Sequence, residues 1–331
     1  FAYLLFQLPA FSQPFTLLKD INFGSNNICL SVKPQPLNLT ELNGQLFFTI
    51  QGNTSPNGLW KSDGTNAGTI RIKEILTEES IASLTKVNNV LFFSVFNANT
   101  GIRELWKSNG TLTGTILVKN WPNYVSITNP VPANGILYFT INDGAAIELW
   151  KSDGTDAGTV ALKSFSAIQN MTDVNGTLLF SANEEVPPYR YNLWKSNGTP
   201  IGTVLVKDIY AGSGSTSFGD FHNANGILFF VGSDGVNGSE LWKSNGTDAG
   251  TIMIKDIETG TGGSNIRRFV TLNSNTYFFA NTAATGNGLW KTDGTDAGTV
   301  IVKDLNDNGS PDYLTLVGNI LFFRGFDDTN G

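Results

Sequence analysis

Charged residues, cysteine and histidine are all scarce in this chain of 331 residues. Only 15% of the residues are charged, and the formal net charge is −7. This composition argues against a coiled coil or a disordered chain, and the acidic balance argues against nucleic acid or an anionic membrane surface as a partner. We interpret the dispersed acidity as a contribution to solubility.

The single cysteine, Cys29, and the single histidine, His222, limit the chemistry further. No intramolecular disulfide can form, and a metal site built from several histidines is excluded. Cys29 has no histidine near it in the sequence, so we interpret it as an ordinary residue and not as a reactive thiol. The sequence predicts no metal site and no cofactor.

Residues 1–12 form an uncharged run rich in leucine and phenylalanine. The run is shorter than the ~20 residues that a membrane-spanning helix needs. Ala10 and Ser12 resemble the small residues that precede a signal-peptide cleavage site. We therefore interpret residues 1–12 as the end of a secretory signal peptide, with an apolar first strand as the alternative. This predicts a secreted or cell-surface protein that does not insert into a membrane.

Glycine, by contrast, is abundant (36 residues), and one motif recurs six times. Its tryptophan stands at positions 60, 106, 150, 194, 242 and 290, and in every copy a threonine follows nine residues later and a lysine thirteen residues later. The best-preserved copy runs from Glu240 to Thr251. A segment that is copied six times without an insertion is a structural module that presents one geometry to its neighbours.

Four strands are predicted in each repeat, for example over residues 266–272, 276–280, 288–292 and 299–305. The first two are joined by Asn-Gly in four copies, beginning at Asn43, Asn134, Asn175 and Asn225. This dipeptide is typical of a type I′ hairpin. The second strand holds adjacent aromatic residues, such as Phe47 and Phe48, which must point to opposite faces of the sheet. Both faces of each sheet are therefore covered.

Four antiparallel strands repeated about every 46 residues predict an all-β fold, a β-propeller of seven four-stranded blades in one domain over residues 13–331. The seventh blade has first and second strands at 313–317 and 320–326. Residues 15–21 match the fourth strand of the module. We predict that they supply the outer strand of this last blade, so that the closing blade is shared between the two ends of the chain and lacks its third strand here.

The copies at Glu104–Thr111 and Glu148–Thr155 resemble the ELWxxDGT repeat of secreted bacterial proteins. The resemblance covers residues 15–331 and departs from the motif before Leu59, Leu193 and Leu289 and at Thr292. It implies a secreted or surface-attached propeller and no particular activity. The Ser-Asp-Gly-Thr turn is also similar to the Asp-box of sialidase-type propellers, a structural hairpin.

Three functional interpretations of the module compete with structural ones. Calcium binding at the turn is disfavoured because Leu112 and Pro200 replace would-be ligands. The repeated tryptophans could stack on sugars, but their fixed place in the module favours packing between blades. The repeated lysines are predicted to shield the outer edges and to pair with nearby aspartates.

Ligand contacts are expected where the copies differ in length. In an up-and-down meander, the connections from second to third strand and from fourth to the next first strand lie at the same end of the blade, and both vary in length. The candidate binding residues on this rim are Arg103, Trp121, Tyr124, Tyr189, Arg190, Tyr191 and Tyr210. The alternative is that these are ordinary solvated loops.

Three functions remain open. The first is a non-catalytic binding or adhesion propeller, monomeric within a longer chain, whose ligand is a polysaccharide or a surface protein. The second is an enzyme of sialidase or polysaccharide-lyase type, which needs clustered arginines with tyrosine or glutamate, or a base such as histidine. The six arginines are sparse in the sequence, and the pair Glu184-Glu185 is a weak acid/base candidate. The third is a structural spacer.

Overall fold

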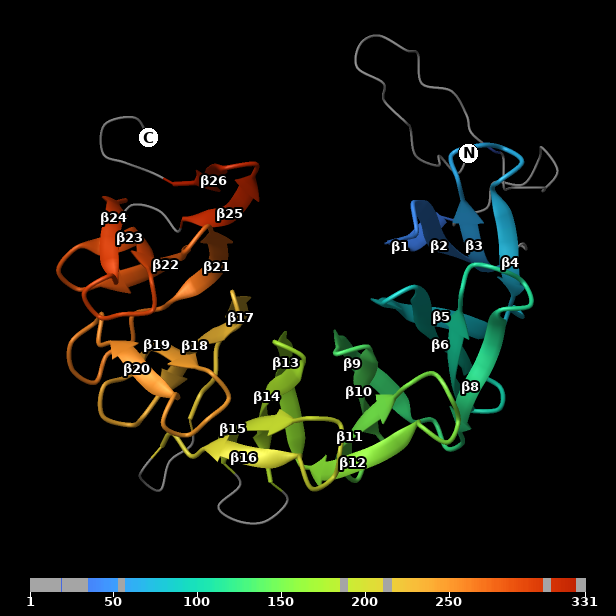
Figure 1. Cartoon of the computed structure of the whole chain (residues 1–331), viewed down its shortest axis with the longest axis horizontal. Helices are drawn as coiled ribbons and strands as arrows, with labels where there is room; N and C mark the ends of the chain where they lie inside the picture. Colours follow the sequence, from blue (N-terminus) through green and yellow to red (C-terminus); the bar gives the residue numbers. More distant parts are fainter. Residues whose placement is uncertain are drawn as a thin grey trace, which may run out of the picture. The chain divides into compact units, whose positions relative to one another are not determined.

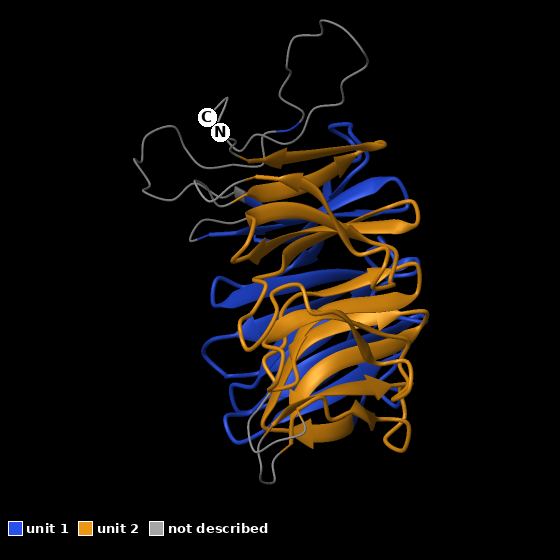
Figure 2. Ribbon diagram, turned by 90° about the vertical axis from the view of Figure 1, so that its left-hand side faces the viewer, with its two compact units in different colours: residues 1–161 blue, residues 162–331 orange. Residues whose placement is uncertain are grey.

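The computed structural model describes residue 19 and residues 35–52, 57–184, 190–210, 216–305 and 311–325. These residues form two compact units, 1–161 and 162–331, and the boundary falls inside a strand, β12 (Figure 2). No helix in the described ranges is long and apolar enough to cross a membrane.

The fold is an all-β propeller whose described strands make seven antiparallel sheets, six of four strands and one of two (Figure 1). In unit 1 the strands are β1 (Gln35–Leu42), β2 (Gln45–Gln51), β3 (Gly58–Ser62), β4 (Ile70–Glu74), β5 (Glu79–Val87), β6 (Val90–Asn97), β7 (Arg103–Ser108), β8 (Thr115–Trp121), β9 (Ser126–Ala133), β10 (Ile136–Asn142), β11 (Ile147–Ser152) and the start of β12 (Val160–Phe165).

Unit 2 continues with the same order of strands. It holds β13 (Ala167–Val174), β14 (Thr177–Asn183), β15 (Tyr191–Ser196), β16 (Val204–Lys207), β17 (Phe221–Ala224), β18 (Ile227–Ser233), β19 (Ser239–Ser244), β20 (Ile252–Lys255), β21 (Arg267–Leu272), β22 (Asn275–Thr282), β23 (Gly286–Thr292), β24 (Val300–Asp304), β25 (Asp312–Val317) and β26 (Ile320–Arg324). Each predicted strand of the 266–305 repeat is confirmed, with ends shifted by at most two residues.

The Asn-Gly hairpins form as predicted. Asn43 and Gly44 have φ angles of 52° and 74°, and the other three pairs are alike. Positive φ at both central residues is the signature of a type I′ turn, which glycine and asparagine adopt at the least cost. The hairpin fixes the register in which the second strand meets the first.

The second strand carries the core to both sides of its sheet. Phe47 packs in a cluster with Leu91 and Phe93 of the next sheet, whereas Phe48 packs with Trp60 on the opposite face. The register places the repeated tryptophan directly across from this second aromatic position, as in the Phe93–Trp106 pair. Those two rings lie 6.4 Å apart. The tryptophans are thus packing residues between sheets, and no ladder of exposed indoles exists among the described residues.

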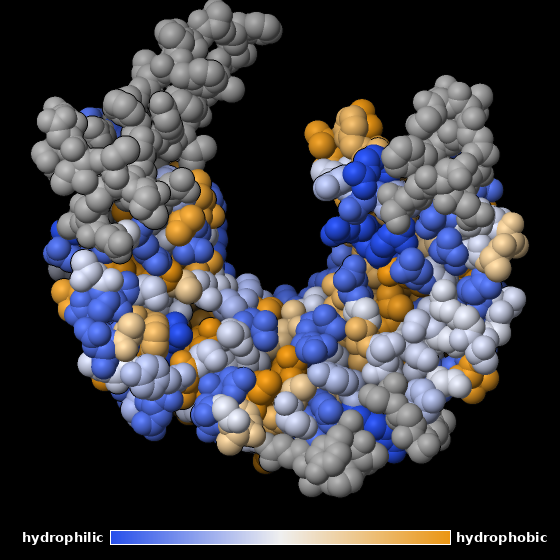
Figure 3. Space-filling view, turned by 180° about the vertical axis from the view of Figure 1, so that it is seen from behind, coloured by the Kyte–Doolittle hydropathy of each residue, from blue (hydrophilic) through white to orange (hydrophobic). Residues whose placement is uncertain are grey.

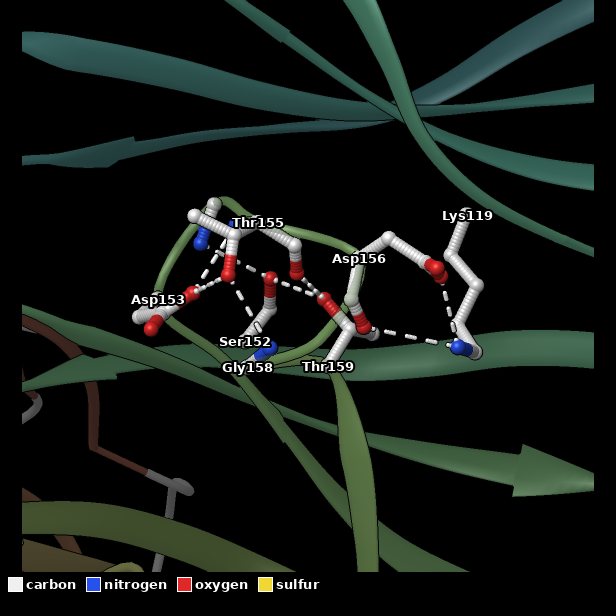
Figure 4. A network of polar contacts seen from close by, with 8 residues as sticks. Lys119, Ser152, Asp153, Thr155, Asp156, Gly158 and Thr159 are labelled. Atoms are coloured by element: carbon white, nitrogen blue, oxygen red, sulfur yellow. Dashed lines mark hydrogen bonds and ion pairs between the residues drawn. The ribbon is translucent and has the colours of Figure 1, made fainter.

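The Ser-Asp/Asn-Gly-Thr turn is held by a fixed set of hydrogen bonds (Figure 4). Ser152 Oγ lies 2.8 Å from Thr159 Oγ1 and accepts a hydrogen bond from Gly154 N at 3.0 Å. Asp153 Oδ1 accepts hydrogen bonds from both N and Oγ1 of Thr155. Asn245 Oδ1 accepts the same two bonds from Thr247. Because only a carbonyl-type oxygen is needed, aspartate and asparagine are interchangeable here.

The fourth-strand lysines connect each sheet to the next one in two ways. Where the next turn offers Asp156, Asp248 or Asp296, the lysine of the preceding fourth strand pairs with it at 2.7–3.0 Å. Where that position is Leu112 or Pro200, the lysine lies over the next tryptophan ring instead, as Lys73 does 3.6 Å from the centre of Trp106. The predicted pairing with aspartate therefore holds for three lysines, and a cation–π contact replaces it in two.

Lys19 also contacts the next turn of the module. Its Nζ donates hydrogen bonds to the carbonyl oxygens of Asn66 and Thr69. Asn66 stands at the turn position of Asp156, so the contact of Lys19 corresponds to that of a fourth-strand lysine. The rest of residues 1–34 lies outside the described residues, including Cys29 and the predicted signal peptide. The sharing of the closing blade stays a prediction.

We expect Ser152→Ala to lower the free energy of unfolding by about 1–3 kcal/mol, because it leaves the amide of Gly154 without its buried acceptor and removes the bond to Thr159 Oγ1, which keeps only its bond to Thr155 O. Ser152→Thr is the matched control. Thr292 occupies this position in the sixth copy and makes the same two bonds at 2.8 and 2.9 Å. Urea denaturation followed by tryptophan fluorescence measures both. Equal stability of the alanine and threonine variants would contradict this account of the turn.

Candidate functional site

The first strand of most sheets contains a bulge at which one residue takes a positive φ. The register shifts by one residue at each bulge, for example between Arg267 and Val270 of β21. The residues with positive φ are Asn38, Ser83, Asn129, Asn170, Arg268 and Tyr313. A bulge redirects the side chains on either side of it, and it is frequent beside functional sites.

Arg268 and Tyr313 are unusual occupants of this position. Asparagine tolerates the left-handed region well, whereas a long or aromatic side chain does so at a cost of about 1 kcal/mol. Three of the six bulges hold asparagine, but β21 and β25 hold Arg268 (φ 62°) and Tyr313 (φ 60°). A strained residue that the repeat does not require is a reason to look for function beside it.

Two hollows flank Arg268 in unit 2. One, of about 410 Å³, is lined by the bulge residues of β13 and β21 and by the start of β17. The other, of about 310 Å³, lies beside Pro311 and Asp312. Asp220 and Arg268 line both. The smaller hollow borders the Asp312 end of β25, whereas Val317 and Ile320 are exposed at the tip of the β25–β26 hairpin. Figure 3 shows hydrophilic and hydrophobic side chains intermingled on the surface of the described residues.

The charges in this site are balanced. Arg268 Nε donates to Asp312 Oδ1 at 2.7 Å, and Asp312 also faces Arg324 across the β25–β26 ladder. The bond from Arg268 holds the pKa of Asp312 below its ordinary value and raises the pKa of Arg268. Arg267 is half-buried and donates to Asn265 O and Asn287 Oδ1. Burial lowers the pKa of Arg267. The ordinary pKa of an arginine is so high that the guanidinium stays protonated at neutral pH.

Aromatic side chains line the larger hollow. Phe221 and Phe269 both border it, and the imidazole of His222 is stacked on Phe269 with ring centres 5.8 Å apart. His222 Nε2 lies 2.7 Å from Thr271 Oγ1. Burial lowers the pKa of His222, so the imidazole is neutral at pH 7. The hollow thus combines apolar ring surface, a guanidinium, a carboxylate and a neutral imidazole.

Glu240 fixes the loop that leads into β21. This fully buried side chain accepts hydrogen bonds from Ile257 N, Ser264 N and Ser264 Oγ at 2.8–3.0 Å. Burial raises its pKa to about 7, and these hydrogen bonds oppose the rise. At the same position of two other sheets, Glu104 and Glu148 accept a hydrogen bond from the module tryptophan instead. The carboxylate of Glu240 therefore binds the loop before β21 and not the tryptophan of its own strand.

At three places in the described residues, the two variable connections meet, as the predicted rim requires. Tyr124 N donates to Gly101 O, Ser166 N to Asn183 O and Ser264 N to Ser239 O, at 2.8–3.1 Å. Each of these bonds joins a connection between second and third strands to one between fourth and first strands.

In unit 1, the candidate binding residues Arg103, Trp121 and Tyr124 differ in how far they are exposed to solvent. Arg103 Nε donates to Val125 O, and its guanidinium lies over the ring of Phe96. Tyr124 is exposed and meets Phe96 edge to face. Trp121 is only 8% exposed and packs against Phe139 and Trp150. Its indole packs in the core, and ligand binding by Trp121 stays a prediction.

In unit 2, the remaining candidates are mostly engaged within the chain. Arg190 Nη1 donates to Tyr210 O at 3.1 Å and lies 3.8 Å from Asp208. The Tyr210 ring lies against Gly235, where a Cβ atom would overlap it. Tyr191 begins β15 and is half-buried. Tyr189 and the adjacent prolines lie outside the described residues.

Sequence reasoning missed the Arg268 site because its charged residues come from three repeats. Arg267, Arg268 and Arg324, half of the arginines, lie on β21 and β26. They are joined by Asp220, which directly precedes β17, and by His222 of β17 and Asp312 of β25. One signal was available, since Arg268 replaces asparagine when the first strands are aligned on their following hairpins. No group of three or more histidine, cysteine, aspartate or glutamate side chains able to hold a metal ion occurs among the described residues.

No family model and no curated protein matches this chain. It is similar to several solved structures. A puromycin hydrolase S511A mutant complexed with PGG shows 14% identity and a TM-score of 0.49, over 88% of this chain and 49% of that one. BamB from Moraxella catarrhalis shows 12% identity and a TM-score of 0.47, over 87% and 82% of the chains. The propeller domain of the Trilobed protease from Pyrococcus furiosus shows 12% identity and a TM-score of 0.44, over 80% and 79%.

This chain therefore spans about half the length of the puromycin hydrolase. Likenesses at these identities and TM-scores carry no inference about activity, substrate or partner.

We expect the stability of the protein to fall as the pH rises from 4.5 to 8 because of Glu240. Its folded pKa of about 7 lies above the ordinary 4.5, so its contribution is complete below pH 4.5 and is lost as the pH passes 7. The loss is on the order of 3 kcal/mol. Glu240→Gln removes the titration. His222 acts in the opposite sense, so the difference between wild type and variant across a pH series of urea denaturations isolates Glu240. Parallel pH curves would contradict this assignment.

Proposed function

We propose that this chain is a non-catalytic glycan-binding propeller and that the glycan binds at the Arg268 site. The observation that supports the proposal most directly is the substitution of Arg268 for asparagine at a strained bulge, beside a hollow of about 410 Å³. Residues that oppose local conformational preference are kept where the side chain itself is needed.

The composition of the hollow suits a sugar. Phe221 and Phe269 offer apolar surface for the C–H faces of a pyranose ring, while Asp220 and Arg268 offer an acceptor and donors for its hydroxyl groups. A surface protein, the other class of ligand considered, fits less well, because a recess of this size admits a few sugar units or one side chain but not a flat interface.

We also propose that the protein acts outside the cell. The apolar residues 1–12 and the resemblance to the repeat of secreted bacterial proteins support this location. A propeller that binds a polysaccharide would serve there in attachment to a surface or to extracellular matrix.

A second candidate function is cleavage of the bound glycan. One observation favours it: the arginines, the histidine and a tyrosine that such chemistry needs, which are scattered in the sequence, are gathered on β17, β21, β25 and β26. His222, neutral at pH 7, is competent to accept a proton. Appearance of shorter oligosaccharides or unsaturated products during incubation would favour this function over simple binding.

We expect Arg268→Asn to weaken glycan binding by at least about tenfold while the protein stays folded. Asparagine occupies the same bulge in β1, β9 and β13, so the variant relieves backbone strain and loses only an exposed ion pair. Its free energy of unfolding should lie within about 1 kcal/mol of wild type. A glycan array, followed by calorimetry on the best ligand, measures the loss.

Tyr124→Ala is the matched control on the rim. It removes an exposed aromatic residue from unit 1 and should leave binding unchanged. If Tyr124→Ala abolishes binding and Arg268→Asn does not, the ligand site lies on the connecting loops. If no glycan on the array binds the wild-type protein, the proposed function is wrong.

A further inference from the structure

The guanidinium of Arg268 is held from one side only. Its Nε donates to Asp312 Oδ1, and its backbone amide lies 3.4 Å from Asp220 Oδ2. Among the described residues, the hydrogen bond of this guanidinium to Asp312 comes from Nε, and neither Nη nitrogen donates one. The side chain is 56% exposed and borders both hollows. Asp312 therefore orients the guanidinium and leaves its terminal nitrogens for something outside the chain.

A free pair of Nη nitrogens has a specific chemical complement. The fork of a guanidinium matches the two oxygens of a carboxylate in a planar, bidentate arrangement, which a hydroxyl group cannot reproduce. The backbone bulge at Arg268 and the hydrogen bond that its Nε donates to Asp312 hold the guanidinium in one orientation before a ligand binds. Little side-chain freedom is then lost when a ligand binds.

Asp220 restricts which carboxylate can bind. It is exposed, and it lines both hollows beside Arg268. With Arg324, which faces Asp312 across the ladder, the charged side chains of the site sum to +1. One carboxylate balances this charge, whereas a doubly charged anion such as phosphate exceeds it. A ligand that presents one carboxylate to Arg268 and neighbouring hydroxyl donors to Asp220 satisfies both groups at once.

A uronic acid has this arrangement of groups. Its carboxylate and its ring hydroxyls lie on one pyranose, and the opposite C–H surface of the ring can cover Phe269. We infer that the Arg268 site binds a glycan through a uronic acid unit, with the carboxylate on the Nη fork of Arg268 and hydroxyl groups on Asp220. This inference rests on the proposed glycan-binding function and narrows its ligand to one chemical class.

The test uses oligosaccharides of galacturonate, glucuronate, mannuronate and guluronate, each paired with its carboxyl-reduced neutral counterpart. Isothermal titration calorimetry with the whole chain should show at least one uronate that binds about tenfold or more tighter than its neutral partner. The preference should shrink as salt is added, because the contact joins an exposed cation to an anion.

Three variants separate the contributions. Arg268→Gln should erase the preference for the acidic member and leave the residual affinity for the neutral one. Arg268→Lys should keep part of the preference, because it retains the charge but not the fork. Asp220→Asn should weaken both members of the pair. Thermal denaturation of each variant checks that the fold is intact, and Arg268→Asn provides a repeat-compatible replacement if Gln disturbs the bulge.

The outcomes distinguish this inference from the proposed function. If neutral and acidic members bind equally, or if Arg268→Gln keeps the preference, the carboxylate contact is wrong while glycan binding stands. If neutral glycans alone bind, the same conclusion holds. If no member of any pair binds and the glycan array is also empty, both the inference and the proposed function are wrong.

Discussion

The aromatic pair on each second strand is the constraint on which the rest of the structure depends. Because successive side chains of a strand point to opposite faces, Phe47 must be buried on one side of its sheet and Phe48 on the other. Neither face can be left in water without exposing a phenylalanine, at a cost of about 2 kcal/mol. A single sheet of this kind is therefore unstable by itself, and the chain must place a neighbour on each side. The β25–β26 hairpin illustrates the point, since Phe322 there is 53% exposed where Phe47 is 1% exposed.

Contacts at the outer strands vary from sheet to sheet and contribute less to the stacking than the buried aromatic residues do. The fourth-strand lysines reach the next sheet whether they find Asp156 or only the face of Trp106. Exposed ion pairs of this kind contribute little, and a cation over an exposed ring contributes a similar amount. Leu112 and Pro200 are consequently tolerated at a position that would be costly to change if the pairing held the sheets together.

The fold was predictable from the sequence because its signals are local and repeated. Asn-Gly hairpins, paired aromatics and the tryptophan module each specify one step of the meander, and six copies remove the ambiguity of any one. The site was not predictable in the same way. Arg268, Asp312 and Asp220 are separated by 44 and 48 residues, and only the stacking of β17, β21 and β25 brings them together. The burial of Trp121 was not predictable for a different reason, because an aromatic residue beside a variable loop looks the same in sequence whether it faces solvent or, as Trp121 does, a neighbouring sheet.

In a repeat protein, equivalent positions of different repeats can be compared to find which side chain the fold itself requires. The bulge of the first strand accepts asparagine in three sheets, which shows that the backbone conformation there requires no large side chain. Glu104 and Glu148 show likewise that the glutamate of the module ordinarily serves the indole of its own strand. Arg268 and Glu240 both depart from these defaults. Glu240 anchors the loop that enters β21 by binding Ser264, and Arg268, four residues further on, is the second residue of the bulged strand. When two departures from a repeat act on one segment of chain, packing alone does not explain them, because the other copies pack without either. The coincidence is explained if the start of β21 must be held still so that one guanidinium keeps its direction.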